Sequence, residues 1–224
     1  MPPKSKSRSQ SGSKAKASPS GLNTTYLLAY NAVSAALWLG VLAQVALIAS
    51  KEGVNNGKVY EGLESYARLT QTGALLEVGH SLLGLVRAPL LTTLMQVSSR
   101  LLLVWGIAYN FPQTTQYSPA YSSMLTAWSV TEVIRYSYFV FTLAGTGVPR
   151  LLVWLRYNTF LILYPIGVAS ETWLIYRAVG PAAEIDEKIP YGLYAVLATY
   201  VPGFYMLFTY MLAQRKKILR TGGK

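Results

Sequence analysis

The segment 155–177, LRYNTFLILYPIGVASETWLIYR, decides the fold class of this chain. It is mostly apolar over the roughly 20 residues that an α-helix needs to cross a bilayer. Tyr164, Gly167 and Glu171 follow one another at spacings of three and four residues, so they lie on one face of such a helix. Tyr157 lies one heptad earlier on the same face. This face is therefore predicted to contact something other than lipid.

Pro165 interrupts the backbone hydrogen bonding of the same segment. Because proline has no N–H, the carbonyl of Leu161 loses its helical partner. In a membrane helix such a free acceptor is satisfied by another donor or by a local change in the helix. The sequence therefore predicts a kink at Pro165, beside Tyr164.

The composition places the whole chain in the membrane class. Of its 224 residues, 52% are hydrophobic and only 13% are charged. The net charge is +11, and of the 20 Lys and Arg five lie in residues 1–25 and five in residues 215–224. Basic ends around an apolar body favour a membrane protein and argue against a nucleic-acid partner.

Cysteine is absent from the chain, and His80 is its single histidine. The lack of cysteine excludes disulfides, thiolate nucleophiles and cysteine-based metal sites. A metal site would need further histidines or clustered carboxylates around His80. The sequence therefore predicts no metal site.

Six segments read as membrane-spanning helices, although the second and the fourth contain charges. They are 26–48, 70–86, 91–111, 120–143, 151–176 and 191–212. The predicted fold class is an all-α membrane protein, a six-transmembrane helix bundle. Residues 1–25 are predicted to be a disordered basic tail, residues 26–214 the transmembrane domain, and residues 215–224 a second basic tail. The distribution of Lys and Arg between the two sides puts both tails in the cytosol.

Charged residues also lie inside the predicted spans. A charge at the centre of a bilayer costs about 2.5 to 3.5 kcal/mol on insertion scales, so it normally faces a partner or a polar cavity. The polar groups are Glu77, His80 and Arg87 on the second span, Gln96 and Arg100 on the third, Glu132 and Arg135 on the fourth, and Tyr164 and Glu171 on the fifth. They could converge on one buried site.

A structural interpretation of these residues is equally open. Glu132 with Arg135, or Glu77 with Arg100, would be ion pairs that set helix register. His80 is explained better as a hydrogen-bonded packing residue than as a ligand. The alternative functions are a transporter or proton-coupled channel that uses the polar faces, and a membrane scaffold without enzymatic activity.

Residues 80–87, HSLLGLVR, look like the His-Cys-x5-Arg signature of tyrosine phosphatases with Ser81 in place of the cysteine. That reaction needs a thiolate on a phosphate-binding loop, whereas Ser81 lies on an apolar helix. The chemistry therefore excludes a phosphatase.

Four blocks of the chain resemble one known family. They are YLLAYN at 26–31, LLEVGHSLLGLVRAPLLTTLMQVSSR at 75–100, WSVTEVIRYSYF at 128–139 and WLRYNTFLILYPIGVASE at 154–171. These blocks resemble the very-long-chain (3R)-3-hydroxyacyl-CoA dehydratases, or protein tyrosine phosphatase-like A proteins. The last two blocks are the most specific.

The resemblance implies a six-span lyase of the endoplasmic reticulum membrane that performs the third step of fatty-acid elongation. It implies a very-long-chain acyl-CoA substrate and no cofactor. The lipid bilayer and other fatty-acid elongation enzymes are the expected partners.

The family's catalytic tyrosine and glutamate map onto Tyr164 and Glu171. Dehydration of a 3-hydroxyacyl thioester needs a base that removes a proton from C2 and an acid that protonates the leaving hydroxyl. A carboxylate and a phenol suit these roles, and both assignments of the two roles stay open. The residues expected to bind the substrate are Gly167, Tyr157, Arg87, Arg100, Glu132, Arg135 and Arg156. Arginines near the cytosolic face are the candidates for the CoA phosphates.

Overall fold

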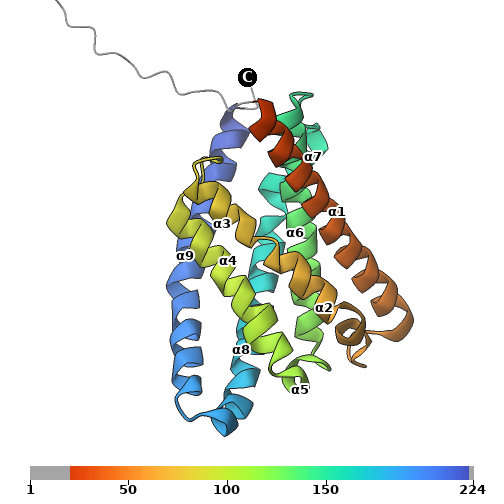
Figure 1. Cartoon of the computed structure of the whole chain (residues 1–224), viewed down its shortest axis with the longest axis vertical. Coiled ribbons are helices and arrows are strands. Elements are labelled where there is room, and N and C mark those ends of the chain that lie inside the picture. Colours follow the sequence, from red (N-terminus) through yellow and green to blue (C-terminus); the bar gives the residue numbers. More distant parts are fainter. Residues whose placement is uncertain (1–20, 222–224) are drawn as a thin grey trace, which may run out of the picture.

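The computed structural model describes residues 21–221, which form a bundle of helices with no β-strand among them (Figure 1). The helices are α1 (Gly21–Glu52), α2 (Lys58–Thr72), α3 (Leu75–Leu82), α4 (Leu90–Leu101), the π-helix η1 (Leu102–Tyr109), α5 (Pro112–Thr115), α6 (Pro119–Ala144), α7 (Arg150–Asn158), α8 (Phe160–Ile185) and α9 (Ile189–Thr221). The predicted all-α class is confirmed for this part of the chain.

The longer helices combine into rods that run alternately up and down the bundle. α2 leads into α3, α4 continues as η1, and α7 leads into α8, while α1, α6 and α9 are single rods. One end of the bundle, the open end, holds the start of α1, loops 83–89 and 145–149, and the end of α9 (Figure 1). The opposite end, the closed end, holds loop 53–57, α5 and loop 186–188.

Glycine and proline set several of the helix ends. Gly57 has a φ of 84° immediately before α2, and Gly145 has a φ of 70° immediately after α6. Residues with a side chain are strained in this left-handed region, so glycine lets the chain turn there. Pro112 and Pro119 begin α5 and α6, at a position where the helix has no partner for an N–H.

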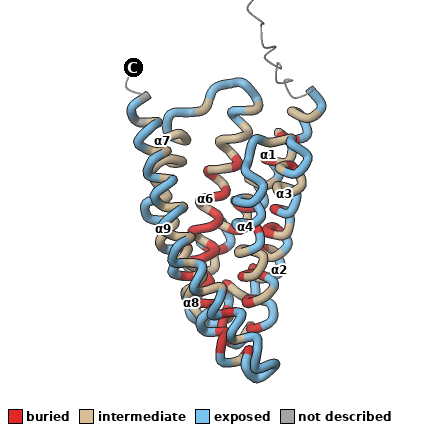
Figure 2. Tube along the Cα trace, turned by 90° about the vertical axis from the view of Figure 1, so that its left-hand side faces the viewer, coloured by how far each residue is buried: buried red, intermediate tan, exposed pale blue. Residues whose placement is uncertain are grey.

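The rods converge at the closed end and spread apart at the open end (Figure 2). α6 packs between α1 and α8. The halves of these helices nearest the closed end carry side chains with no exposed surface, among them Val41 on α1, Met124 and Leu125 on α6, and Leu174 and Ile175 on α8. Close packing of apolar side chains therefore holds the bundle together at one end and leaves room between the helices at the other.

Three helical stretches are long and apolar enough to cross a membrane: Gly21–Glu52, Leu90–Tyr109 and Ile189–Ile218. A fourth is added if α7 and α8, which are bent by 44° relative to one another, count as one span. α6 is 26 residues long, but Glu132, Arg135 and many hydroxyl side chains make it less apolar. The described residues thus contain three or four candidate spans, and the number six stays a prediction.

The second predicted span, 70–86, does not correspond to one helix. α2 begins at Lys58, the helix is interrupted at Gly73 and Ala74, and α3 ends at Leu82. The prediction missed most of α2 because charged side chains on its outer face reduce its mean hydropathy, while its apolar residues are buried inside the bundle.

The fifth segment is bent at Thr159, between α7 and α8, while Pro165 lies inside α8. The Thr159 hydroxyl donates a hydrogen bond of 2.8 Å to the carbonyl oxygen of Leu155. Such a side-chain bond competes with the backbone and often bends a helix. The predicted face is therefore interrupted, because Tyr157 lies on α7 and Tyr164 on α8.

The first and last helices extend further than the predicted spans. α1 begins at Gly21, inside the predicted tail 1–25, and α9 continues to Thr221, inside the predicted tail 215–224. A helix adds one hydrogen bond for each further residue, so it can continue past the end of the apolar pattern. The rest of the two predicted tails, 1–20 and 222–224, lies outside the described residues.

Candidate active site

Glu171 lies in the middle of α8, where α6 and α9 both approach it. Trp128 of α6 donates from its indole Nε1–H to Oε1 of Glu171 at 2.8 Å. Tyr200 of α9 donates from its hydroxyl to Oε2 at 2.9 Å. Both carboxylate oxygens therefore accept a hydrogen bond from an uncharged donor, and three helices build this one site.

Gly167 lies one turn before Glu171 on the same helix and is buried. A Cβ atom at this position would lie 3.7 Å from the Cβ of Ala127 and 3.9 Å from Oε1 of Glu171. These are ordinary contact distances, so a small side chain would fit. The glycine therefore leaves a space beside the carboxylate that any other residue would fill.

Tyr164 lies on the side of α8 that faces α9. Its ring stacks on Phe204 and Phe208, with centroids 5.3 and 6.2 Å away and interplanar angles of 14° and 10°. It is close enough to Glu171 for the two groups to interact electrostatically. Among the described residues, however, the hydrogen bonds to Glu171 come from Trp128 and Tyr200. α9 therefore contacts both predicted catalytic residues.

Four charged side chains form a separate ion-pair network. Arg135 binds Glu77 of α3 through two hydrogen bonds of 2.9 and 2.6 Å, and binds Glu132 at 2.6 Å. Glu132 also pairs with Arg100 of α4, and the Tyr136 hydroxyl donates to Glu77. Glu132 is only 3% exposed, so two guanidinium groups compensate its burial.

This network decides between the two predicted ion pairs. The pair of Glu132 with Arg135 is confirmed. The pair of Glu77 with Arg100 is wrong, because Arg135 holds Glu77 and Glu132 holds Arg100. The sequence leaves this choice open because it does not say which helices are neighbours.

Arg100 connects the network to the site around Glu171. Its guanidinium group lies 5.0 Å from the centroid of the Trp128 ring, on the ring face. It also interacts electrostatically with Glu171. Arg100 and Trp128 thus link the ion-pair network to the site around Glu171.

The only histidine takes part in side-chain packing. His80 is buried, and Tyr26 of α1 hydrogen-bonds its Nε2 at 2.8 Å. Ser81, which replaces the phosphatase cysteine, donates to the carbonyl of Ala88 at 2.8 Å. Within residues 21–221 no three His, Asp or Glu side chains come together as ligands of a metal ion.

The remaining predicted substrate-binding residues lie towards the open end. Arg87 is exposed in loop 83–89. Arg156 of α7 packs its guanidinium group against Tyr138 and Phe139, 4.4 and 4.9 Å from the ring centroids. Tyr157 is half-buried beside Tyr138. Arg156 and Tyr157 are thus brought together at Tyr138 of α6 rather than at Glu171.

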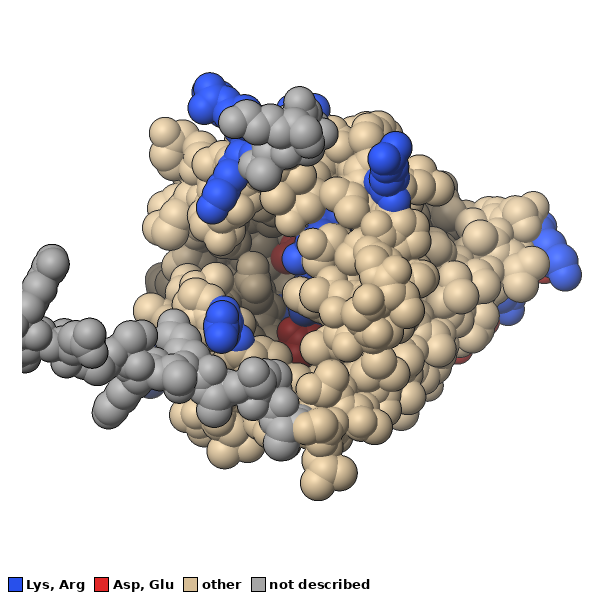
Figure 3. All heavy atoms as spheres, turned by 90° about the horizontal axis from the view of Figure 1, so that it is seen from above, with Lys and Arg blue, Asp and Glu red and all other residues tan. Residues whose placement is uncertain are grey.

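Seen from the open end, the molecule is hollowed between the helices (Figure 3). Lys and Arg side chains surround this hollow, and both acidic and basic side chains are visible inside it. Glu77 lies on α3, which leads to this end, whereas Glu132 and Glu171 lie near the middle of α6 and α8. The charged side chains visible in this hollow are therefore reached from the open end of the bundle.

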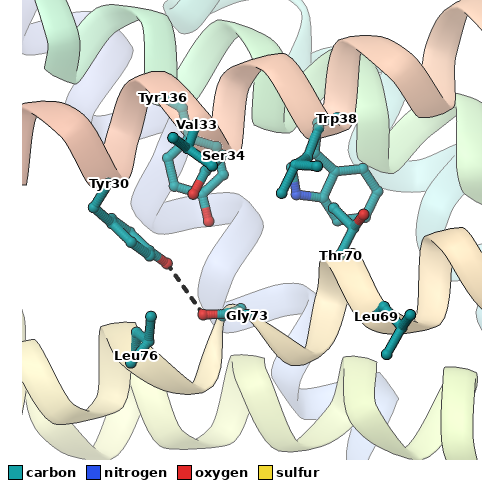
Figure 4. Close-up of a pocket in the computed structure, with 11 residues that line it drawn as sticks. Tyr30, Val33, Ser34, Trp38, Leu69, Thr70, Gly73, Leu76 and Tyr136 are labelled. Atoms are coloured by element: carbon teal, nitrogen blue, oxygen red, sulfur yellow. Dashed lines mark hydrogen bonds between the residues drawn. The ribbon is translucent and has the colours of Figure 1, made fainter.

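A second cavity lies between α1 and the junction of α2 with α3 (Figure 4). Its walls are mostly apolar, and the Tyr30 hydroxyl donates to the carbonyl of Gly73 at 3.4 Å across it. Tyr136 of α6 also lines it. Because α6 packs between α1 and α8, it separates this cavity from Glu171. The cavity is therefore not part of the candidate active site.

Trp128 and Tyr200 were missed as site residues. Trp128 begins the block 128–139, and its position four residues before Glu132 was the available signal. No comparable signal marks Tyr200, because the many tyrosines of the chain resemble the aromatic belt of a membrane protein. Their distances of 43 and 29 residues from Glu171 explain why local patterns do not identify them.

Comparison with known proteins finds relatives over most of the chain. A family model for protein tyrosine phosphatase-like proteins, PTPLA, matches residues 71–221. The chain is 45% identical over 200 residues to a probable very-long-chain (3R)-3-hydroxyacyl-CoA dehydratase of Schizosaccharomyces pombe, covering 88% of this chain and 94% of that relative. No solved structure matches the chain at a significant level.

Two further relatives have similar names. The chain is 41% identical to the very-long-chain (3R)-3-hydroxyacyl-CoA dehydratase PASTICCINO 2 of Arabidopsis thaliana, over 87% of this chain and 92% of the relative. It is 39% identical to the very-long-chain (3R)-3-hydroxyacyl-CoA dehydratase hpo-8 of Caenorhabditis elegans, over 89% of this chain and 97% of the relative.

Proposed function

The chain belongs to the protein tyrosine phosphatase-like family, PTPLA, and from this membership we propose that it is a hydro-lyase of fatty-acid elongation. It dehydrates very-long-chain (3R)-3-hydroxyacyl-CoA to the trans-2-enoyl-CoA. The observation that carries the proposal is the identity of 39 to 45% with relatives named for this reaction, over nearly the whole length of both chains.

The proposed reaction needs two proton transfers. Glu171 takes the proton from C2, the electron pair forms the C2–C3 double bond, and the C3 hydroxyl leaves as water with a proton from Tyr164. A proton then returns from Glu171 to Tyr164 and restores both groups. The opposite assignment uses the same two residues. The space that Gly167 leaves beside Oε1 supports a substrate position next to Glu171.

The cationic residues at the open end suit the phosphates of coenzyme A. Arg87, Arg150 and Arg156 lie at or near this end, and Arg87 and Arg150 are exposed. Guanidinium groups bind phosphate through paired hydrogen bonds. In this proposal the CoA part stays at the rim, while the acyl thioester enters the hollow towards Glu171.

The charged residues at the two ends of the bundle support a membrane topology. The charged residues of the described open end are basic, including Arg87, Arg150 and Arg215, whereas the closed end also carries Glu184 and Asp186. The positive-inside rule then places the open end and both termini in the cytosol. We propose that the six rods are six spans in the endoplasmic reticulum membrane, next to other elongation enzymes.

Arg100, Glu132 and Arg135 contribute to substrate binding indirectly in this proposal. Their guanidinium and carboxylate groups are paired with one another and with Glu77. Their contribution is therefore to hold α3, α4 and α6 around the space that the substrate enters.

A transporter lacks comparable support, because apolar side chains fill the closed end of the described bundle.

The test is a dehydration assay with the full chain purified in detergent. A very-long-chain (3R)-3-hydroxyacyl-CoA is supplied, and formation of the trans-2-enoyl-CoA is followed by chromatography. Conversion at a catalytic rate supports the proposal. Absence of product, together with solute or proton flux through the chain in liposomes, would favour the transporter instead.

A further inference from the structure

Neutral donors from two other helices hold the carboxylate of Glu171, one at each oxygen. The Trp128 Nε1–H lies 2.8 Å from Oε1, and the Tyr200 hydroxyl lies 2.9 Å from Oε2. We propose that Trp128 and Tyr200 are positioning residues, which hold this carboxylate in the orientation in which it removes the C2 proton. The inference rests on the proposed function and adds two residues to it.

The indole of Trp128 is held in place by the bundle itself. It is 2% exposed, and its ring meets the Trp38 ring edge to face, with 6.4 Å between the centroids. The Arg100 guanidinium group covers one face of the same ring. An indole N–H is a hydrogen-bond donor with no acceptor site, and it is not ionised near neutral pH. Its function at Glu171 is therefore to orient the acceptor rather than to transfer a proton.

Tyr200 connects the carboxylate to the other catalytic group through the backbone of α9. Phe204 and Phe208, one and two turns further along α9, form the stack on which the Tyr164 ring lies. One helix thus sets the position of the Glu171 carboxylate and of the Tyr164 phenol. Because general acid and base must act on adjacent carbons, their relative placement determines the rate.

Two hydrogen bonds do not occupy all the lone-pair sites of the Glu171 carboxylate. An ionised carboxylate has about four lone-pair sites, so two sites of Glu171 stay available for the proton of C2. The space left by Gly167 adjoins Oε1. With one donor fixed at each oxygen, the free sites point in defined directions before the substrate arrives, which lowers the reorganisation needed for reaction.

The experiment removes each donor and keeps an aromatic ring at each position. Trp128→Phe and Tyr200→Phe are assayed in the full chain, with a very-long-chain (3R)-3-hydroxyacyl-CoA over a range of concentrations. Each variant is expected to lower kcat by about ten- to a hundredfold, as loss of a hydrogen bond to a charged group predicts, with KM within about twofold of wild type. Trp173→Phe on α8 and Tyr205→Phe on α9, both exposed, are the matched controls and should keep the wild-type kcat.

The outcomes separate this inference from the proposed function. Wild-type kcat in both variants, alongside an inactive Glu171→Gln, would overturn the positioning role and leave the proposed function standing. A rise of KM at unchanged kcat would also overturn it, because it would assign the residues to substrate binding. Full activity of Glu171→Gln would contradict the proposed site itself. If Trp128→Phe does not fold, Tyr200→Phe decides, since it removes a single oxygen atom.

Discussion

Glu132 and Glu171 are both carboxylates inside the helix bundle, but their partners differ in charge. Glu132 is 3% exposed and is paired with the guanidinium groups of Arg100 and Arg135. Glu171 accepts its hydrogen bonds from an indole and a phenol. A carboxylate between two cations has its charge balanced and serves to hold helices together. A carboxylate with neutral donors keeps its capacity to take up a proton, as a general base must.

The largest expected effect that follows from this comparison is that of Glu171→Gln. The amide keeps the size of the side chain but cannot act as a base, so kcat should fall by at least about 10³-fold. The measurement is the initial rate of enoyl-CoA formation, with thermal unfolding followed in parallel. Glu184→Gln, an exposed carboxylate on the same helix, is the matched control. Activity close to wild type in Glu171→Gln would remove the distinction between the two carboxylates.

Tyr164→Phe should have the next largest effect. The stack on Phe204 and Phe208 stays, while the proton donor is lost, so kcat should fall by about 10²-fold or more without a change in the melting temperature. Tyr176→Phe, exposed on the same helix, is the control. If Tyr164→Phe retained activity, another group would have to be the acid. Tyr200, whose hydroxyl binds Glu171, would then be the candidate.

Glu132→Gln tests the other half of the comparison. It leaves the Arg100 guanidinium group without its carboxylate partner inside the bundle, and loss of one member of a buried ion pair costs about 3 to 5 kcal/mol. We expect a clear drop in the melting temperature of the detergent-solubilised protein. Glu61→Gln, at an exposed ion pair with Lys58, should leave the melting temperature nearly unchanged. Equal melting temperatures for the two variants would contradict a stabilising network.

Gly167→Ala should have the smallest effect. The added methyl group enters the space beside Oε1 of Glu171 at ordinary contact distance, so we expect KM to rise by roughly three- to tenfold. Stability should stay the same or increase, because alanine favours a helix over glycine by about 1 kcal/mol. Gly180→Ala, at an open position on the same helix, provides the comparison. An unchanged KM would place the substrate away from Gly167.

The sequence by itself determined the helical class and the membrane character, and its resemblance to a known family marked Tyr164 and Glu171 as the residues proposed for catalysis. The spacing of Tyr164, Gly167 and Glu171 is a property of a single helix, and a helix forms through hydrogen bonds between residues four apart. Apolar segments likewise act within their own length. The helical class, the membrane character and the shared helix face were accessible because the interactions behind them are local.

Only the tertiary structure decided the partners of each group. Trp128 and Tyr200 reach Glu171 from other helices, and Arg135 rather than Arg100 holds Glu77. Which side chains meet depends on which helices are neighbours and on how far each is rotated and bent, as the break at Thr159 illustrates. Contacts between residues that are distant in sequence therefore give Glu132 and Glu171 different partners.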